Sequence, residues 1–311
     1  MDDCTWRFGT VATSRIVSAY RGHDRVAHDR LASVNGTLIH TSMGDVEYAE
    51  AGSGEPILVI HGIFGGCDAG LLSFDDVLTD RRVIAPSRFG YLGSSMPPSA
   101  TPALQADAYS ELLDRLGIGS TDVIGYSAGS SSAIQFALRY PNRVRHLVIM
   151  CGDLPGPTAV APPPIARVLF RSDFIMWLAA VLARPTLMRF IGGLPKDANP
   201  SDEQRKILLR MVESIFPVRE RSQGVLFDGF VSNPAVNAYP LEQIDVPILF
   251  VHARDDNLAS FSAAQAAAAR VPGARLLTLE NGGHIMLGQR EAIRAVLTEF
   301  LSASATAKRS A

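Results

Sequence analysis

The sequence predicts an α/β fold in which a mostly parallel central sheet is flanked by helices and carries an inserted helical cap. Apolar runs of strand length alternate with helical segments from Pro56 onward, and these runs are continuously apolar. Such runs are typical of strands that helices cover on both faces. Residues 154–239, in contrast, have the pattern of consecutive helices without strands. A length of 311 residues, with 47% hydrophobic and 19% charged residues, fits one large globular domain or two closely joined ones.

Residues 1–35 form an extension ahead of the sheet. Their charges are mixed and their periodicity is weak, so we expect a short helix there. Two β-type runs follow, at residues 38–41 and 46–49, with Met43-Gly44-Asp45 between them. This spacing predicts a hairpin.

The predicted core comprises residues 36–153 and 240–303. Its apolar strands are residues 56–62, 82–87, 121–127, 144–150, 247–253 and 274–280. Helices are predicted between them, at residues 101–116, 128–140, 260–271 and 289–302. The dipeptide Thr101-Pro102 favours a helix start, because proline is preferred at the first helical position. Alternating strands and helices indicate an open α/β sheet.

The cap, residues 154–239, begins with a proline-rich stretch and follows the fourth of these apolar strands. Its predicted helices are residues 165–182, 185–191, 202–214 and 218–230. Because the cap interrupts the sheet, we expect it to cover the functional site. Its aromatic residues Phe174 and Trp177 are candidate substrate-binding groups, although aromatic residues on helices commonly serve in packing. Residues 304–311 are of low complexity, and we expect a disordered tail.

Charge and composition exclude several classes of partner. The net charge is −2, whereas nucleic-acid binding normally needs a clustered basic face. Three cysteines do not make a disulfide framework and favour a cytoplasmic location. The most hydrophobic window, residues 174–183, is too short to span a bilayer, so we expect no stable membrane insertion. We expect a monomer or homodimer with a small-molecule substrate and no cofactor or metal.

Gly125-Tyr126-Ser127-Ala128-Gly129 is the motif that most directly indicates chemistry. It matches G-x-S-x-G, with a predicted strand before it and a predicted helix after it. A serine on such a tight turn projects its hydroxyl above the sheet, and side chains two residues to either side would clash, which requires glycine. Ser127 is therefore the candidate nucleophile, and the Ala128 amide is a candidate oxyanion donor.

A second glycine-rich segment, His61-Gly62-Ile63-Phe64-Gly65-Gly66, follows the first core strand. Glycines let a loop approach a ligand closely and leave amides free. At this position the fold supplies a second oxyanion donor, for which we expect the Ile63 amide, with Phe64 as the alternative. His61 is interpreted as a structural residue that hydrogen-bonds the loop.

A serine nucleophile needs a base, and the base needs an orienting acid. Of the seven histidines, His284 in Asn281-Gly282-Gly283-His284 follows the last strand, on the same sheet edge as Ser127. The other histidines lie in the extension or within strands, and His252 is one of the latter. Asp255 and Asp256 follow the next-to-last strand and compete for the role of the acid. The chain order Ser, Asp, His fits this type of site.

These motifs, in this order, resemble the α/β-hydrolase superfamily of serine hydrolases, over nearly the whole chain. The resemblance implies an α/β-hydrolase fold and favours Asp256, since the family places the acid fourth in G-x-x-D and Ala253 stands in the glycine position. IHGIFGGCDAGL and APSRFGYLGSSMP also resemble a bacterial esterase group that includes mono-alkyl phthalate ester hydrolases. Many members have an aspartate before the arginine at Pro86-Ser87-Arg88, so we expect Arg88 to lack that partner. It could then face a substrate carboxylate, or bond to loop carbonyls.

The resulting hypothesis is a carboxylic ester hydrolase that acts on small apolar or aromatic esters, including phthalate monoesters, through an acyl-enzyme on Ser127. The same triad could instead serve a lactonase, a C–C bond hydrolase or an acyltransferase. A receptor that binds a small molecule without turnover is the remaining alternative.

Overall fold

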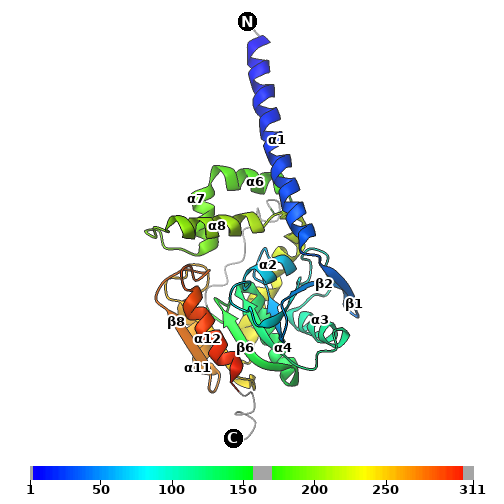
Figure 1. The fold of residues 1–311 in the computed structure, drawn as a ribbon, viewed down its shortest axis with the longest axis vertical. Helices are drawn as coiled ribbons and strands as arrows, with labels where there is room; N and C mark the ends of the chain where they lie inside the picture. The colour runs from blue at the N-terminus through cyan, green and yellow to red at the C-terminus, as the bar shows by residue number, and fades with distance from the viewer. Residues whose placement is uncertain (1–2, 157–169, 304–311) are drawn as a thin grey trace.

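The computed structural model describes residues 3–156 and 170–303. The chain begins with α1 (Asp3–Ser33), a single helix of 31 residues that projects away from the rest of the molecule (Figure 1). The prediction of a short helix was therefore wrong in length. Along its C-terminal half α1 packs on the cap, where the Tyr20 and Trp177 ring centroids lie 5.7 Å apart and Ala27 is buried.

An eight-stranded sheet forms the centre of the molecule, in the order β1-β2-β4-β3-β5-β6-β7-β8. The strands are β1 (Thr37–Thr41), β2 (Gly44–Ala51), β3 (Glu55–Ile60), β4 (Arg81–Pro86), β5 (Thr121–Tyr126), β6 (Val144–Met150), β7 (Ile248–Ala253) and β8 (Arg275–Leu279). The β1–β2 and β2–β4 pairs are antiparallel, whereas the pairs from β4 to β8 are parallel. The predicted hairpin and the six predicted core strands are confirmed.

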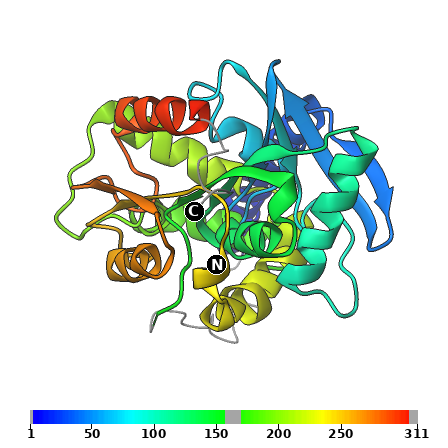
Figure 2. The ribbon, with the colours of Figure 1, turned by 90° about the horizontal axis from the view of Figure 1, so that it is seen from below.

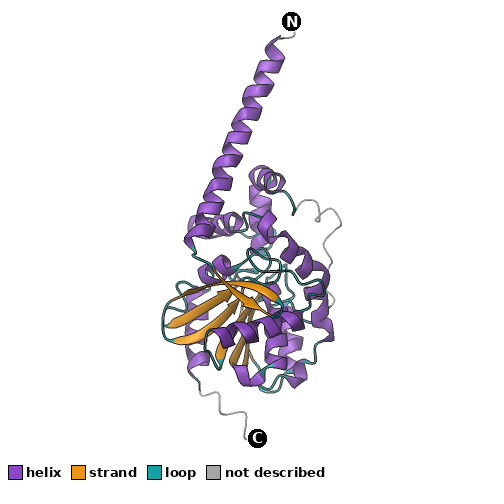
Figure 3. Ribbon diagram, turned by 90° about the vertical axis from the view of Figure 1, so that its right-hand side faces the viewer, coloured by secondary structure: helices purple, strands orange, loops and turns teal. Residues whose placement is uncertain are grey.

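Helices cover both faces of this sheet (Figure 3). One face carries α3 (Pro102–Arg115), α4 (Ser130–Arg139) and α11 (Phe261–Arg270), and the other carries α2 (Cys67–Leu72) and α12 (Arg290–Ser302). Seen from below, α11 and α12 lie on opposite sides of the strands (Figure 2). The short helix α2 was not predicted. The predicted start of α3 is confirmed, because the Thr101 hydroxyl accepts a hydrogen bond from the Leu104 amide at 3.1 Å.

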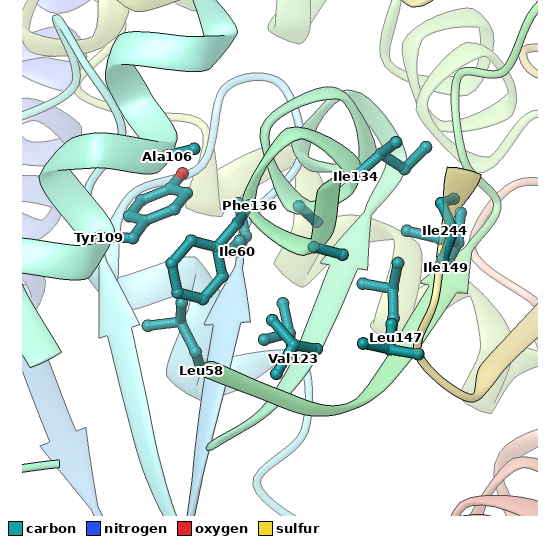
Figure 4. Packing of buried hydrophobic residues seen from close by; sticks show 14 of the residues in the cluster. Leu58, Ile60, Ala106, Tyr109, Val123, Ile134, Phe136, Leu147, Ile149 and Ile244 are labelled. Carbon is teal, nitrogen blue, oxygen red and sulfur yellow. The ribbon is translucent and has the colours of Figure 1, made fainter. Parts of the chain in front are cut away.

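The core forms because alternate residues of each central strand point to opposite faces. Leu58 and Ile60 of β3 face α3 and α4, where they join Tyr109 and Phe136 (Figure 4). Ile57 and Val59 of the same strand belong to the cluster on the other face, which includes Leu297 and Phe300 of α12. Continuous apolar runs therefore correspond to strands that are buried on both sides.

The cap follows β6, as predicted, and its described part contains mainly helices. These are α6 (Asp173–Leu182), α7 (Arg184–Gly192), α8 (Asp202–Ser214), η3 (Arg219–Arg221), α9 (Ser222–Phe227), the π-helical η4 (Asp228–Ser232), α10 (Asn233–Ala235), η5 (Val236–Ala238) and, at the return to the core, η6 (Leu241–Gln243). The helix predicted at 218–230 is thus divided into three segments. Residues 165–169 of the first predicted cap helix, and the tail at 304–311, lie outside the described residues.

Within the described ranges, no single helix has both the length and the apolarity needed to cross a membrane. The consecutive helices α6 and α7 reach that length and composition only together, and they are bent by 101°.

Candidate active site

Ser127 lies on the tight turn between β5 and α4, with a backbone φ of +50° that is unusual for a residue with a side chain. Such a conformation costs about 1–3 kcal/mol and persists only where the surroundings enforce it. Both flanking glycines are required. A Cβ on Gly125 would lie 2.6 Å from the Ala133 Cβ, and a Cβ on Gly129 would lie 2.4 Å from the Ile60 carbonyl oxygen.

The predicted base and acid meet Ser127 in one line of hydrogen bonds. The His284 Nε2 lies 2.7 Å from the Ser127 Oγ, and the His284 Nδ1 lies 2.9 Å from the Asp256 Oδ2. All three side chains are at most 9% exposed. With Nδ1–H donating to the carboxylate, the Nε2 lone pair can accept the serine proton.

Asp256 accepts more hydrogen bonds than the triad alone requires. Its Oδ1 accepts from the amides of Leu258 at 2.8 Å and Ala259 at 3.0 Å. His252 Nε2 lies 3.3 Å from the Asp256 Oδ2. Burial by itself would raise the pKa of Asp256, but hydrogen bonds from His252, His284 and the Ala259 amide outweigh it and hold the pKa well below its usual value. The carboxylate is therefore kept ionised.

The contact of His252 with the acid was missed, because a histidine within a strand gives no local sign of its neighbours. His252 lies four residues before Asp256, and its ring contacts the carboxylate. Asp255 has a different position. Its carboxylate accepts from the amides of Gly282 and Gly283, at 3.2 and 2.9 Å, and so holds the loop that carries His284.

The predicted oxyanion loop lies directly beside the nucleophile. A Cβ on Gly62 would be 3.1 Å from the Ser127 Cβ, so glycine permits this approach. The Ile63 amide and its alternative, the Phe64 amide, both lie on this loop. His61 has the structural role expected of it. Its Nδ1 lies 2.7 Å from the Gly62 carbonyl oxygen, and its Nε2 accepts from the Arg88 amide at 3.0 Å.

Arg88 lacks the usual aspartate at the preceding position, where Ser87 stands, but it has another carboxylate partner. The guanidinium is 1% exposed and donates to both oxygens of Asp228, at 2.5 and 2.6 Å, and to the Gly62 carbonyl at 3.2 Å. Asp228 belongs to the cap, 140 residues further along the chain, so no motif around Arg88 could reveal it. A guanidinium that is enclosed and paired in this way is not available to a substrate carboxylate.

The two cap aromatics predicted to bind substrate pack instead against α1. The Trp177 ring centroid lies 6.4 Å from that of His23 and 6.1 Å from that of Phe174, and the Phe174 centroid lies 5.3 Å from that of Tyr20. The sequence did not indicate these contacts because the length of the first helix was underestimated; Trp177 is buried, whereas Phe174 remains 36% exposed. Closer to the site, the rings of Phe64 and Phe170 lie edge to face, with centroids 5.0 Å apart.

A segment of the cap that the sequence did not single out lies against the triad. The His284 amide donates to the Gly192 carbonyl at 2.8 Å, and the Asn257 amide donates to the Gly193 carbonyl at 3.0 Å. Gly193 has a φ of +57°, and a Cβ there would lie 2.5 Å from the His284 Cβ and 3.0 Å from the Asp256 Oδ1. The end of α7 therefore helps to fix the histidine.

Gly193→Ala is expected to lower kcat/KM about 10- to 100-fold, since a displacement of about 1 Å at catalytic groups can cost 10²-fold. The added methyl group must push against His284 or Asp256. The matched control is Gly117→Ala, which has a similar φ of +67° but no atom within 4 Å of the new Cβ. Both variants introduce backbone strain, but only Gly193→Ala also presses on the triad. Steady-state kinetics and thermal denaturation of the two variants therefore separate these effects. Equal losses in the two variants would contradict this role for Gly193.

Another carboxyl group near the triad is Asp153, which follows β6. Burial, and after it the charge of Asp228, raise its pKa to about 6 against the opposing effect of His284. The Asp153 amide also lies 3.5 Å from the Ser127 carbonyl oxygen. The described part of the chain contains no cluster of three or more His, Cys, Asp or Glu residues that could hold a metal ion.

Comparisons with known proteins show the family and the fold. A family model described as "alpha/beta hydrolase fold" matches residues 55–291, a range that includes the cap and the strands from β3 to β8 but not α1, β1 or β2. The chain is 30% identical to an uncharacterized hydrolase, YcgS, of Bacillus subtilis over 275 residues, covering 83% of this chain and 95% of that protein. It is also 30% identical to a 2-hydroxymuconate semialdehyde hydrolase of Pseudomonas putida over 247 residues, covering 76% of this chain and 82% of that protein.

Among solved structures, an esterase from Exiguobacterium antarcticum superposes with a TM-score of 0.66 at 18% identity. The match covers 86% of this chain and 100% of the esterase chain. At this level of identity the likeness concerns the fold.

Proposed function

Because this chain belongs to the α/β-hydrolase family, we propose that it is a serine-dependent hydrolase of neutral carboxylic esters. The observation that carries the proposal is the line of hydrogen bonds from Ser127 through His284 to Asp256, beside a loop with an amide available for an oxyanion. These are the parts that acyl transfer through a serine requires.

The proposed reaction has two halves. His284 Nε2 takes the Ser127 proton as the oxygen attacks the ester carbonyl carbon, and the amides of Ile63 and Ala128 stabilise the oxyanion. The C–O bond to the alcohol then breaks, and the alcohol leaves with the proton from His284. Water attacks the acyl-enzyme in the same way, releases the acid and restores Ser127. Asp256 keeps the imidazole in the required tautomer and stabilises its protonated form.

The charges around the site favour a neutral substrate over an anionic one. The two arginines next to the oxyanion loop are both at most 1% exposed and both paired, Arg88 with Asp228 and Arg221 with Asp68. Asp153 adds a negative charge close to His284 at a pH above its pKa of about 6. A substrate carboxylate would therefore meet a carboxylate rather than a cation, which is unfavourable in a site shielded from water.

This proposal is tested by comparing p-nitrophenyl butyrate with mono-p-nitrophenyl succinate at pH 8, where Asp153 is ionised. The two esters are similar in length, but only the succinate carries a carboxylate. We expect equal amounts of acid and p-nitrophenol from the butyrate, and a kcat/KM at least about tenfold higher for it, since tenfold corresponds to only about 1.4 kcal/mol. A preference for the succinate would contradict the inferred substrate charge, and no turnover of either ester would contradict the esterase proposal.

Carbon–carbon bond hydrolysis is the second candidate, because one relative bears the name of a 2-hydroxymuconate semialdehyde hydrolase. The same triad would serve that reaction. Product analysis with a vinylogous 1,5-diketone, run beside the ester pair, distinguishes the two. Cleavage of the diketone with no ester turnover would favour the carbon–carbon reaction.

A further inference from the structure

The peptide between Gly62 and Ile63 is fixed by its carbonyl group. The Gly62 oxygen is contacted by three nitrogens, which are the Gly65 amide at 3.2 Å, the His61 Nδ1 at 2.7 Å and the Arg88 Nη2 at 3.2 Å. A peptide is planar, and its C=O and N–H point in opposite directions. Groups that hold the Gly62 carbonyl on one side therefore direct the Ile63 N–H to the other side.

Arg88 is in turn held by a residue of the cap. The Asp228 carboxylate accepts hydrogen bonds from both terminal nitrogens of the Arg88 guanidinium, at 2.5 and 2.6 Å, and from the Tyr91 hydroxyl. Asp228 is fully buried and begins the π-helical turn η4, an irregularity that is frequently found at functional sites.

A second buried ion pair also links the cap to the core beside this loop, with the positions of the arginine and the acid exchanged. Here the arginine, Arg221, is on the cap and the acid, Asp68, is on α2 of the core, with N–O distances of 2.7 and 3.0 Å. Arg221 Nη1 also donates to the Gly65 carbonyl at 2.5 Å. The oxyanion loop is thus held at Gly62 and at Gly65 by two arginines whose carboxylate partners lie across the core–cap boundary.

We propose that Asp228 is a positioning residue for the oxyanion hole, which acts through Arg88 and the Gly62 carbonyl to orient the Ile63 N–H. The inference rests on the proposed function, because it assigns to that amide a role in acyl transfer. Asp228 does not touch the substrate. It makes the geometry of the oxyanion hole depend on the cap, so that core residues alone do not complete the site.

The test measures two rates in Asp228→Asn. One is phosphonylation of Ser127 by a fluorophosphonate, which forms a new P–O bond to Ser127 and expels fluoride without any ester. The other is kcat per phosphonylatable site with p-nitrophenyl butyrate. We expect both to fall about 10- to 100-fold, with KM changed less than about threefold, since removal of one whole oxyanion donor costs about 10²- to 10³-fold in kcat.

Asp122→Asn is the matched control. Asp122 is also a buried aspartate, paired with Arg81 at 3.0 Å and with Arg145, but it lies at the start of β5, the end of the strand away from Ser127. We expect its rates per site to match the wild type even if its melting temperature falls. An Asp228→Asn protein that is merely less stable would show fewer reactive sites but normal rates per site, and this result would overturn the proposal.

The double variant Arg88→Met/Asp228→Leu covers the case in which Asp228→Asn does not fold. It leaves no unpaired buried charge, and apolar replacement of a whole buried ion pair is often tolerated. It still lacks the guanidinium donor to Gly62, so we expect the same fall in both rates. Wild-type rates in this folded variant would overturn the inference.

The two measurements also separate this inference from the proposed function. If wild-type Ser127 is phosphonylated but no ester is hydrolysed, the esterase proposal fails and Asp228 is judged on the phosphonylation rate alone. If folded wild-type protein is not phosphonylated at Ser127, no oxyanion hole operates there and the inference is overturned as well.

Discussion

Replacing Ser127 with alanine is expected to lower kcat for p-nitrophenyl butyrate by at least about 10⁴-fold, because loss of a serine nucleophile costs up to about 10⁶-fold where it has been dissected. Without the hydroxyl no acyl-enzyme can form. His284 and the oxyanion amides would remain in place, so weak residual hydrolysis by bound water is compatible with the mechanism. The measurement is p-nitrophenol release by purified protein whose melting curve matches the wild type.

Ser132→Ala is the appropriate control for this experiment. Ser132 is also buried on the same chain segment, but its hydroxyl lies 3.1 Å from the Tyr109 hydroxyl, on the side of the helix that faces α3. We expect its activity to stay within a few-fold of the wild type. Substantial turnover in Ser127→Ala would show that another group is the nucleophile.

Asp256→Asn is expected to lower kcat by about 10⁴-fold, the size of the loss when the acid of a serine-protease triad is changed to its amide. The substitution keeps the shape but replaces the carboxylate that stabilises protonated His284. An asparagine NH₂ group turned toward Nδ1 would favour the wrong tautomer and leave no free lone pair at Nε2. The decisive measurement is kcat, because the substrate does not contact this residue in the proposed mechanism.

Asp255→Asn provides a control at the adjacent position. Its carboxylate accepts only from the Gly282 and Gly283 amides among the contacts described, and an amide oxygen can still accept one of them. We expect a loss of less than about tenfold, since the change weakens loop support without touching the imidazole. The opposite ranking of the two variants would assign the acid to Asp255.

Local patterns were sufficient to predict the nucleophile turn and the sheet. The requirement for glycine at 125 arises within a few residues of Ser127, whereas the requirement at 129 comes from the Ile60 carbonyl on the neighbouring strand β3. His284 could be placed because parallel strands end at the same sheet edge, which brings loops distant in sequence close to Ser127. Adjacent Asp255 and Asp256 were harder to distinguish, because only the backbone path decides which carboxylate faces the histidine.

Contacts between the cap and the core could not be predicted in this way. Arg88 and Asp228 are separated by 140 residues, and neither is surrounded by a pattern that identifies the other. The same holds for Gly193 beside His284, since a glycine at the end of a helix is common for conformational reasons alone. The length of α1 was underestimated because the weak periodicity of its sequence does not indicate where the helix begins.

The crossed ion pairs at the core–cap boundary bear on how the specificity of this protein could be re-engineered. A chimera that keeps the core but takes residues 154–239 from another hydrolase would leave Arg88 and Asp68 behind, each buried and each deprived of its counter-ion. Breaking one such pair typically destabilises a protein by about 3–5 kcal/mol, a large part of the total stability of most domains. A transplanted cap would have to supply an acidic residue at position 228 and a basic residue at position 221. Otherwise Arg88 and Asp68 of the core would have to be replaced by neutral residues. The cap is therefore not an interchangeable module. Libraries that vary it should keep Arg221 and Asp228, and they are best confined to positions between the end of α7 and these two residues.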